Sequence, residues 1–146
     1  MRKNILIAAL FGLAVPAISV QAEGPDFEKD IYPFIKESCL ECHKPPYEDE
    51  RGRTRKPKGG LVMATKEGLL KGAGDEDDGW EEIIVAGKPD DSSIYTSTML
   101  SMSDDDHMPP EDKAEELTDA QKELLKAWIA AGADFGDWTA DPEFAK

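Results

Sequence analysis

Apolar side chains recur at helical spacing in two stretches that lie near opposite ends of the chain. In the first, residues 27–35, apolar positions are separated by four, three and one residues, which is the period of one helix face. Pro33 lies inside this stretch, and proline removes a helical hydrogen bond. We therefore expect a bend there, or a helix that begins near Tyr32. The apolar face consists of Phe27, Ile31, Phe34 and Ile35.

The second stretch, residues 118–132, has the clearest boundaries. Thr118 and Gln121 have the spacing of a capping box, which marks a helix start. Gly132 suits the left-handed exit of the same helix. Its apolar face is formed by Leu124, Leu125, Trp128 and Ile129. We expect this face to pack on residues 27–35, which would bring the two ends of the domain together.

Between these stretches, short apolar segments alternate with polar loops. Residues 48–58 hold five positive charges and almost no apolar side chain, so we predict a solvated loop. Thr65 and Gly72 have the positions of an N-cap and a C-terminal glycine for a brief helix, and residues 89–92 mark the start of another. Helices joined by loops predict an all-α fold.

The chain begins with the pattern of a secretory signal. Arg2 and Lys3 precede an apolar run from Ile5 to Val20, and Val20-Gln21-Ala22 has the small residues of a cleavage site. We therefore assign residues 1–22 as a signal peptide. An uncleaved anchor is the alternative, although the run is shorter than the ~20 residues that a spanning helix needs.

Removing the signal leaves enough chain for one domain, which we assign to residues 23–136, with residues 137–146 as a C-terminal tail. The whole chain carries a formal charge of −14, and loss of Arg2 and Lys3 makes the mature chain −16. This charge disfavours nucleic acid as a partner, and we expect no stable membrane insertion after cleavage. It favours a partner with a basic docking face, whose attraction weakens as salt rises.

The most informative chemistry lies in Cys39-Leu40-Glu41-Cys42-His43, where two thiols three positions apart precede a histidine. This is the spacing of covalent attachment to a c-type haem. Each of Cys39 and Cys42 can form a thioether, and His43 is placed to bind the iron. These are the only two cysteines, so one haem c would consume both. Such attachment takes place outside the cytoplasmic membrane in bacteria, so the signal and the motif together predict a periplasmic protein.

The ligand on the other side of the iron is less obvious. The side chains that we consider are Met63, Met99, Met102, His107 and Met108. Met108 precedes Pro109-Pro110, which pushes its backbone into an extended geometry and stiffens the next segment. A rigid loop that presents a thioether suits a haem that must reorganise little on oxidation. We favour Met108, with His107 as the alternative.

At this point the chain resembles a known family. The haem motif, Val85-Ala86-Gly87-Lys88-Pro89, Met108-Pro109-Pro110 and the tryptophan helix with Gly132 are similar to the planctomycete-type c-type cytochrome domain, itself similar to single-haem class I cytochromes c. The resemblance implies an all-α, class I-like helical domain wrapped around one covalent haem. His43 would be the proximal ligand and Met108 the distal ligand, with Pro109 beside it. A proline carbonyl, of Pro45 or Pro46, would orient the proximal imidazole.

We expect the protein to be an electron carrier, not an enzyme: a periplasmic mono-haem cytochrome with His/Met-ligated iron that moves single electrons between redox partners. One alternative is a haem enzyme or gas sensor, such as a peroxidase-like site with a labile distal ligand. Another is a protein without haem, either a thioredoxin-like thiol pair or a zinc site. Thiol redox pairs usually begin a helix, whereas we expect Cys39 and Cys42 to close one.

Overall fold

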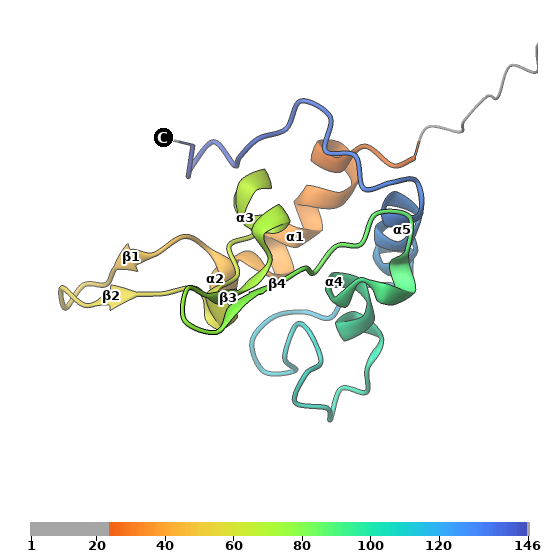
Figure 1. The fold of residues 1–146 in the computed structure, drawn as a ribbon. Helices are drawn as coiled ribbons and strands as arrows, with labels where there is room; N and C mark the ends of the chain where they lie inside the picture. Colours follow the sequence, from red (N-terminus) through yellow and green to blue (C-terminus); the bar gives the residue numbers. More distant parts are fainter. Residues whose placement is uncertain (1–23, 146) are drawn as a thin grey trace, which may run out of the picture.

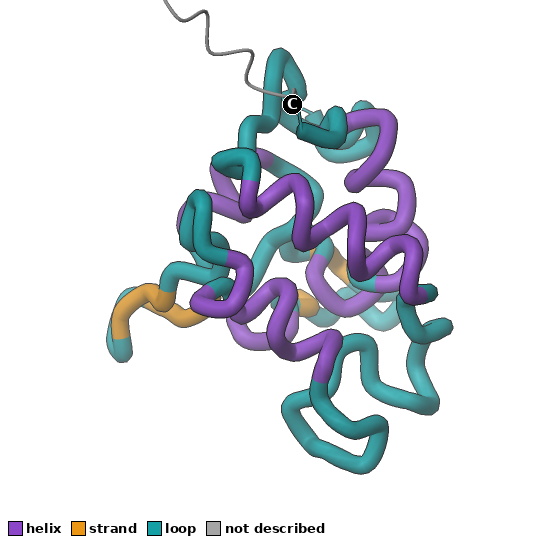
Figure 2. Tube along the Cα trace, turned by 90° about the vertical axis from the view of Figure 1, so that its right-hand side faces the viewer, coloured by secondary structure: helices purple, strands orange, loops and turns teal. Residues whose placement is uncertain are grey.

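The computed structural model describes residues 24–145, so the predicted signal peptide lies outside the described residues. This part of the chain holds five α-helices, which surround a common core (Figures 1 and 2). Within it, no helix combines the length and apolarity that a membrane crossing needs. The helices are α1 (Tyr32–Ser38), α2 (Leu40–His43), α3 (Lys66–Lys71), α4 (Ser93–Thr96) and α5 (Asp119–Ala130).

Tighter or wider helical turns extend several of these helices. A π-helical turn, Phe27–Ile31, leads into α1, and Pro33 is the second residue of α1, where its missing N–H leaves no bond unmade. The expectation that the helix begins near Tyr32 is therefore confirmed. The 3-10 turns are Lys58–Gly60, Pro89–Asp91 and Ser97–Met99.

The expectation of an all-α fold is wrong. Two small antiparallel sheets lie in the connections between helices: β1 (Tyr47–Glu48) pairs with β2 (Thr54–Arg55), and β3 (Ala73–Asp75) pairs with β4 (Gly79–Glu81). The first hairpin extends away from the helices (Figure 1). We expected residues 48–58, which include most of this hairpin, to form a solvated loop. The chain reverses direction at Gly52, whose φ is +70°. The fold is thus mixed, with helices around the core and two hairpins at its edge.

Helix boundaries follow the capping residues seen in the sequence. Thr118 and Gln121 form both halves of a capping box at the start of α5. The Thr65 hydroxyl accepts a hydrogen bond from the Gly68 N–H at the start of α3, which ends at Gly72. These side chains satisfy N–H groups that have no partner inside the helix. The predictions made for these two helices are confirmed.

The core forms where the beginning and the end of the described chain meet. The ring centroid of Phe27 lies 5.0 Å from that of Trp128 on α5, and 4.6 and 4.7 Å from those of Phe135 and Trp138. Ile31, Ile35, Leu125 and Ile129 are fully buried around these rings. The predicted packing of residues 27–35 on the last helix is therefore confirmed.

A buried carboxylate fastens the segment after α5 to α1. Asp141 accepts hydrogen bonds from the Tyr32 hydroxyl at 2.8 Å and from the Lys36 ammonium at 2.7 Å. Burial alone would raise the pKa of Asp141, but the hydrogen bond from Lys36 and the others outweigh it, and the pKa is lowered. Ala140 also forms a β-bridge with Thr65. Residues of the segment assigned as a C-terminal tail, such as Trp138 and Asp141, are thus buried against the helices.

Candidate functional site

A cavity of about 850 Å³ opens between the first helices and the loop that precedes α5. Its walls are mainly apolar, with Phe34, Ile35, Ile83, Ile94 and Leu125 among the lining residues. Cys39, Cys42 and His43 line it from one side of the fold, and Met108 and Pro109 line it from the loop. The structure therefore brings together five of the residues singled out in the sequence.

The two thiols and the histidine are held by consecutive helical turns. Cys39 joins α1 to α2, and Cys42 and His43 form the last turn of α2, so the motif closes a helix as expected. Both cysteines are free of disulfides. Burial raises the pKa of the Cys39 thiol to about 12, with the neighbouring Cys42 adding to the shift. A thiol with so high a pKa is a poor nucleophile at neutral pH, which disfavours the thioredoxin-like alternative.

The imidazole of His43 is oriented by a backbone carbonyl. Its Nδ1 lies 3.1 Å from the carbonyl oxygen of Lys58. Because a carbonyl only accepts, Nδ1 carries the proton and Nε2 keeps a free lone pair, as a metal ligand requires. Burial lowers the pKa of His43, and this hydrogen bond offsets only part of the effect. The ring is therefore held as a neutral, singly protonated imidazole.

The carbonyl that orients His43 comes from Lys58, whereas we expected Pro45 or Pro46. Neither proline is among the residues that line the cavity. Lys58 begins the 3-10 turn that follows the β1–β2 hairpin, and Gly59 and Gly60 in that turn have φ values of +57° and +66°. Glycine adopts these angles without strain. The Gly59-Gly60 pair was the only sign of this acceptor in the sequence.

Met108 lines the same cavity from the loop that follows α4. Its backbone N–H donates to the Ser97 carbonyl at 3.1 Å, which ties the loop to the turn after α4, and its peptide bond with the buried Pro109 is cis. Met63 also lines the cavity. However, the Met63 N–H donates to the His43 carbonyl at 2.8 Å, so Met63 lies on the His43 side. Met99 and Met102 are not among the lining residues.

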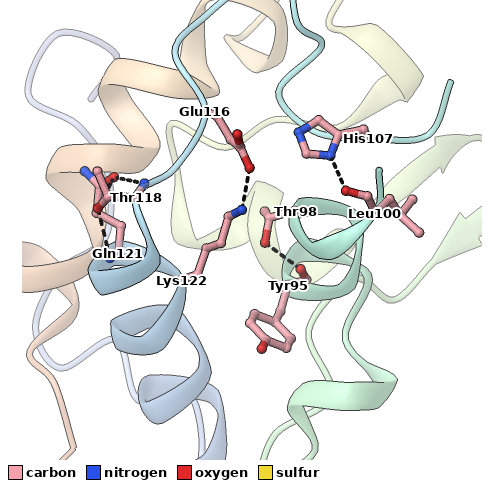
Figure 3. A network of polar contacts seen from close by, with 8 residues as sticks. All are labelled: Tyr95, Thr98, Leu100, His107, Glu116, Thr118, Gln121 and Lys122. Carbon is pink, nitrogen blue, oxygen red and sulfur yellow. Dashed lines mark hydrogen bonds and ion pairs between the residues drawn. The ribbon is translucent and has the colours of Figure 1, made fainter. Parts of the chain in front are cut away.

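His107, which precedes Met108 in this loop, is buried and is not among the residues that line the cavity. Figure 3 shows its ring directed at the Leu100 carbonyl, and the distance from Nδ1 to that oxygen is 3.0 Å. Nδ1 therefore carries the proton, and Nε2 is buried without a hydrogen-bond partner. The ring of His107 is held in the same way as that of His43, but it does not line the cavity, so we interpret His107 as a residue that fixes the loop.

The residues around the cavity fit a c-type haem. A haem is a broad apolar disc with two vinyl groups, and the cavity pairs apolar walls with two free thiols and an imidazole whose Nε2 is available. Lys58 and Lys113 on the rim offer positive charge for its carboxylates. Residues 24–145 contain no group of three or more His, Cys, Asp or Glu side chains placed to share a metal ion, so the zinc alternative finds no donor set there.

Comparison with known proteins gave one match. A family model described as Planctomycete cytochrome C matches residues 39–112, just over half of the chain. The matched region begins at Cys39 and includes Met108, so it holds the thiols, the histidine and the methionine that line the cavity. No curated protein and no solved structure matches the chain.

Proposed function

Because the chain belongs to the planctomycete cytochrome C family and is therefore a haem-binding electron carrier, we propose that it is a mono-haem c-type cytochrome of the periplasm. In this proposal it carries single electrons between two redox proteins. The signal pattern of residues 1–22 supports export. The presence of only two cysteines supports one covalently attached haem.

The observation that carries the proposal is that Cys39, Cys42, His43 and Met108 line one cavity. A bound haem supplies a one-electron couple between ferric and ferrous iron. Cys39 and Cys42 would form the thioethers, His43 would bind through Nε2, and Met108 would provide the distal sulfur. The apolar walls keep water away, which together with methionine ligation favours a higher potential than two histidines would give.

The peroxidase-like alternative has less support. Such chemistry needs a distal acid–base group within hydrogen-bond reach of the reacting oxygen. His107 is the residue nearest in sequence to Met108 that could act as this acid–base group. It is not among the lining residues, and its ring is directed at the Leu100 carbonyl. A closed, six-coordinate centre that carries electrons is the better reading of this arrangement.

Haem staining of a denaturing gel tests the proposal. The full-length protein, expressed with a haem-attachment system, should retain stained haem after denaturation, because thioethers survive it. The control is the double variant Cys39→Ala and Cys42→Ala, which should not stain. Reduced wild-type protein should bind carbon monoxide slowly or not at all. Unstained wild-type protein would refute covalent attachment, and rapid, tight carbon monoxide binding would refute the six-coordinate assignment.

A further inference from the structure

Three apolar side chains that line the cavity or lie next to a lining residue in sequence remain exposed. Met99, Leu100 and Met108 are 55%, 39% and 36% exposed, and we name them the distal patch. They are contiguous because the Met108 N–H binds the Ser97 carbonyl and the His107 ring binds the Leu100 carbonyl. Leu100 and Met108 also line the cavity. Two of the three members of the distal patch are therefore part of the wall that would cover the haem.

The loop around the distal patch is strongly acidic. Residues 101–116 carry a formal charge of −6, and Lys113 is the only cation among them. Of the seven acidic residues in this loop, Glu116 alone takes part in an ion pair within residues 24–145, with Lys122. The acidic residues are Asp104, Asp105, Asp106, Glu111, Asp112, Glu115 and Glu116.

The hairpin segment 47–58, of which Lys58 lines the cavity, has the opposite sign. It carries a formal charge of +2, but part of its positive charge is already compensated within the hairpin. Arg53 and Arg55 both pair with Asp49, each at 2.9 Å. The unpaired acidic charge at the distal patch is thus larger than the unpaired basic charge at the hairpin.

We propose that the distal patch is the docking surface for a redox protein whose contact face carries lysine or arginine around an apolar centre. The proposal rests on the proposed electron-carrier function and names its partner. An apolar centre with a polar rim is the usual anatomy of a protein interface. Complementary charge at the rim speeds and orients encounter. Contact at Met108 would also place the partner directly over the iron ligand.

Oxidation of the ferrous holoprotein by small complexes of opposite charge tests this surface. Tris(phenanthroline)cobalt(III) is an apolar cation and mimics a basic contact face, and ferricyanide is an anion. Each accepts one electron, giving ferric protein and cobalt(II) or ferrocyanide. The test variant neutralises the loop with Asp105→Asn, Glu111→Gln and Asp112→Asn, whose side chains accept none of the hydrogen bonds found. The matched control makes the same charge change in the β3–β4 turn, with Glu76→Gln, Asp77→Asn and Asp78→Asn.

At low ionic strength, the loop variant should react severalfold more slowly with the cobalt complex and faster with ferricyanide, whereas the control should change both rates much less. The difference should disappear at 1 M salt, where the Debye length falls to about 3 Å. Equal effects of the two variants would overturn the proposal, as would a larger effect from the hairpin variant Arg51→Glu and Lys56→Glu. Loss of haem staining or of any one-electron oxidation would instead count against the proposed function.

A second pair of variants tests the apolar centre. Met99→Gln should slow the reaction with the cobalt complex, whose phenanthroline rings need an apolar contact, and should leave the ferricyanide rate nearly unchanged. Leu70→Gln on α3 is the control, because Leu70 is the more exposed of the two and is not among the lining residues. If the two variants are oxidised by the cobalt complex at equal rates, the apolar patch is not part of the docking surface.

Discussion

The two walls of the cavity are built in different ways. The proximal wall, residues 39–43 with the 58–63 segment, consists of short helical turns whose groups bind one another: the His43 ring donates to Lys58, and the His43 carbonyl accepts from Met63. The distal wall, residues 97–110, is irregular, and Met108 is held through backbone contacts with Ser97. The proximal wall therefore fixes the His43 ring itself by a hydrogen bond, whereas the hydrogen bond found at Met108 fixes its backbone.

The largest effect is expected on the coordination of the haem iron, when the distal wall loses Met108. Met108→Ala removes only the distal sulfur, so haem should stay attached through Cys39 and Cys42 while the iron gains an open position. The reduced variant should bind carbon monoxide rapidly, as followed by absorption spectroscopy. Met102→Ala is the matched control, because Met102 is in the same loop but does not line the cavity. An unchanged spectrum and no carbon monoxide binding in Met108→Ala would eliminate Met108 as the ligand.

The proximal wall should be most sensitive to substitution in the turn that contains Gly59 and Gly60, where we expect a loss of folding stability. An added Cβ at Gly60 would lie 1.8 Å from the Gly74 carbonyl oxygen, whereas one at Gly59 would meet nothing within 4 Å. Both residues have positive φ. Gly60→Ala should therefore cost about 3–4 kcal/mol of unfolding free energy, from backbone strain plus overpacking, and Gly59→Ala about 1 kcal/mol. Denaturant titration measures both, and equal losses would mean that the Gly60–Gly74 contact is unimportant.

A smaller effect should come from the carboxylate behind α1. Because the pKa of Asp141 is lowered in the folded state, its contribution to stability is complete above the ordinary value of 3.8. It is lost as the pH falls through the lowered folded-state pKa. Asp141→Asn should cost about 1–2 kcal/mol at pH 7, and less in strong acid. Thermal unfolding across this pH range checks the prediction, and a pH-independent difference between the two proteins would contradict it.

The smallest loss of stability is expected from substitution of His107, on the distal wall. Asparagine can keep a donor at the position of Nδ1, whereas glutamine places its amide near Nε2. His107→Gln should lose the bond to Leu100, cost about 1 kcal/mol, and let carbon monoxide displace the distal ligand faster. His107→Asn should stay close to wild type in that rate. If the two variants admit carbon monoxide at the same rate, the Leu100 hydrogen bond does not position Met108.

What the sequence could predict depends on how far apart the interacting residues lie along the chain. The capping residues at Thr65 and Thr118 and the Cys39–His43 motif act on neighbours a few positions away, so their meaning is visible in the chain itself. The role of Met108 as the distal ligand could be inferred only through the family resemblance and the stiff Pro109-Pro110 segment. Its presence in the same cavity as His43 depends on packing between segments far apart in sequence.

Other features left no side-chain signature. The strands of the two hairpins are two or three residues long, too short for alternation of apolar and polar residues to emerge. The acceptor for His43 is a backbone carbonyl, which every residue possesses, so Lys58 could not be told from Pro45 or Pro46. Asp141 resembles any surface acid until the fold buries it against Tyr32.

The contact between Asp141 and Tyr32 joins residues 109 positions apart and so closes most of the described chain into a single loop. The entropy cost of closing a loop grows only with the logarithm of its length, and a doubling costs about 0.6 kcal/mol. Lengthening or shortening the β1–β2 or β3–β4 hairpin by a few residues therefore hardly changes that cost. The lengths of the two hairpins, and with them the surface available to partners, can therefore change while the residues that line the cavity keep their positions.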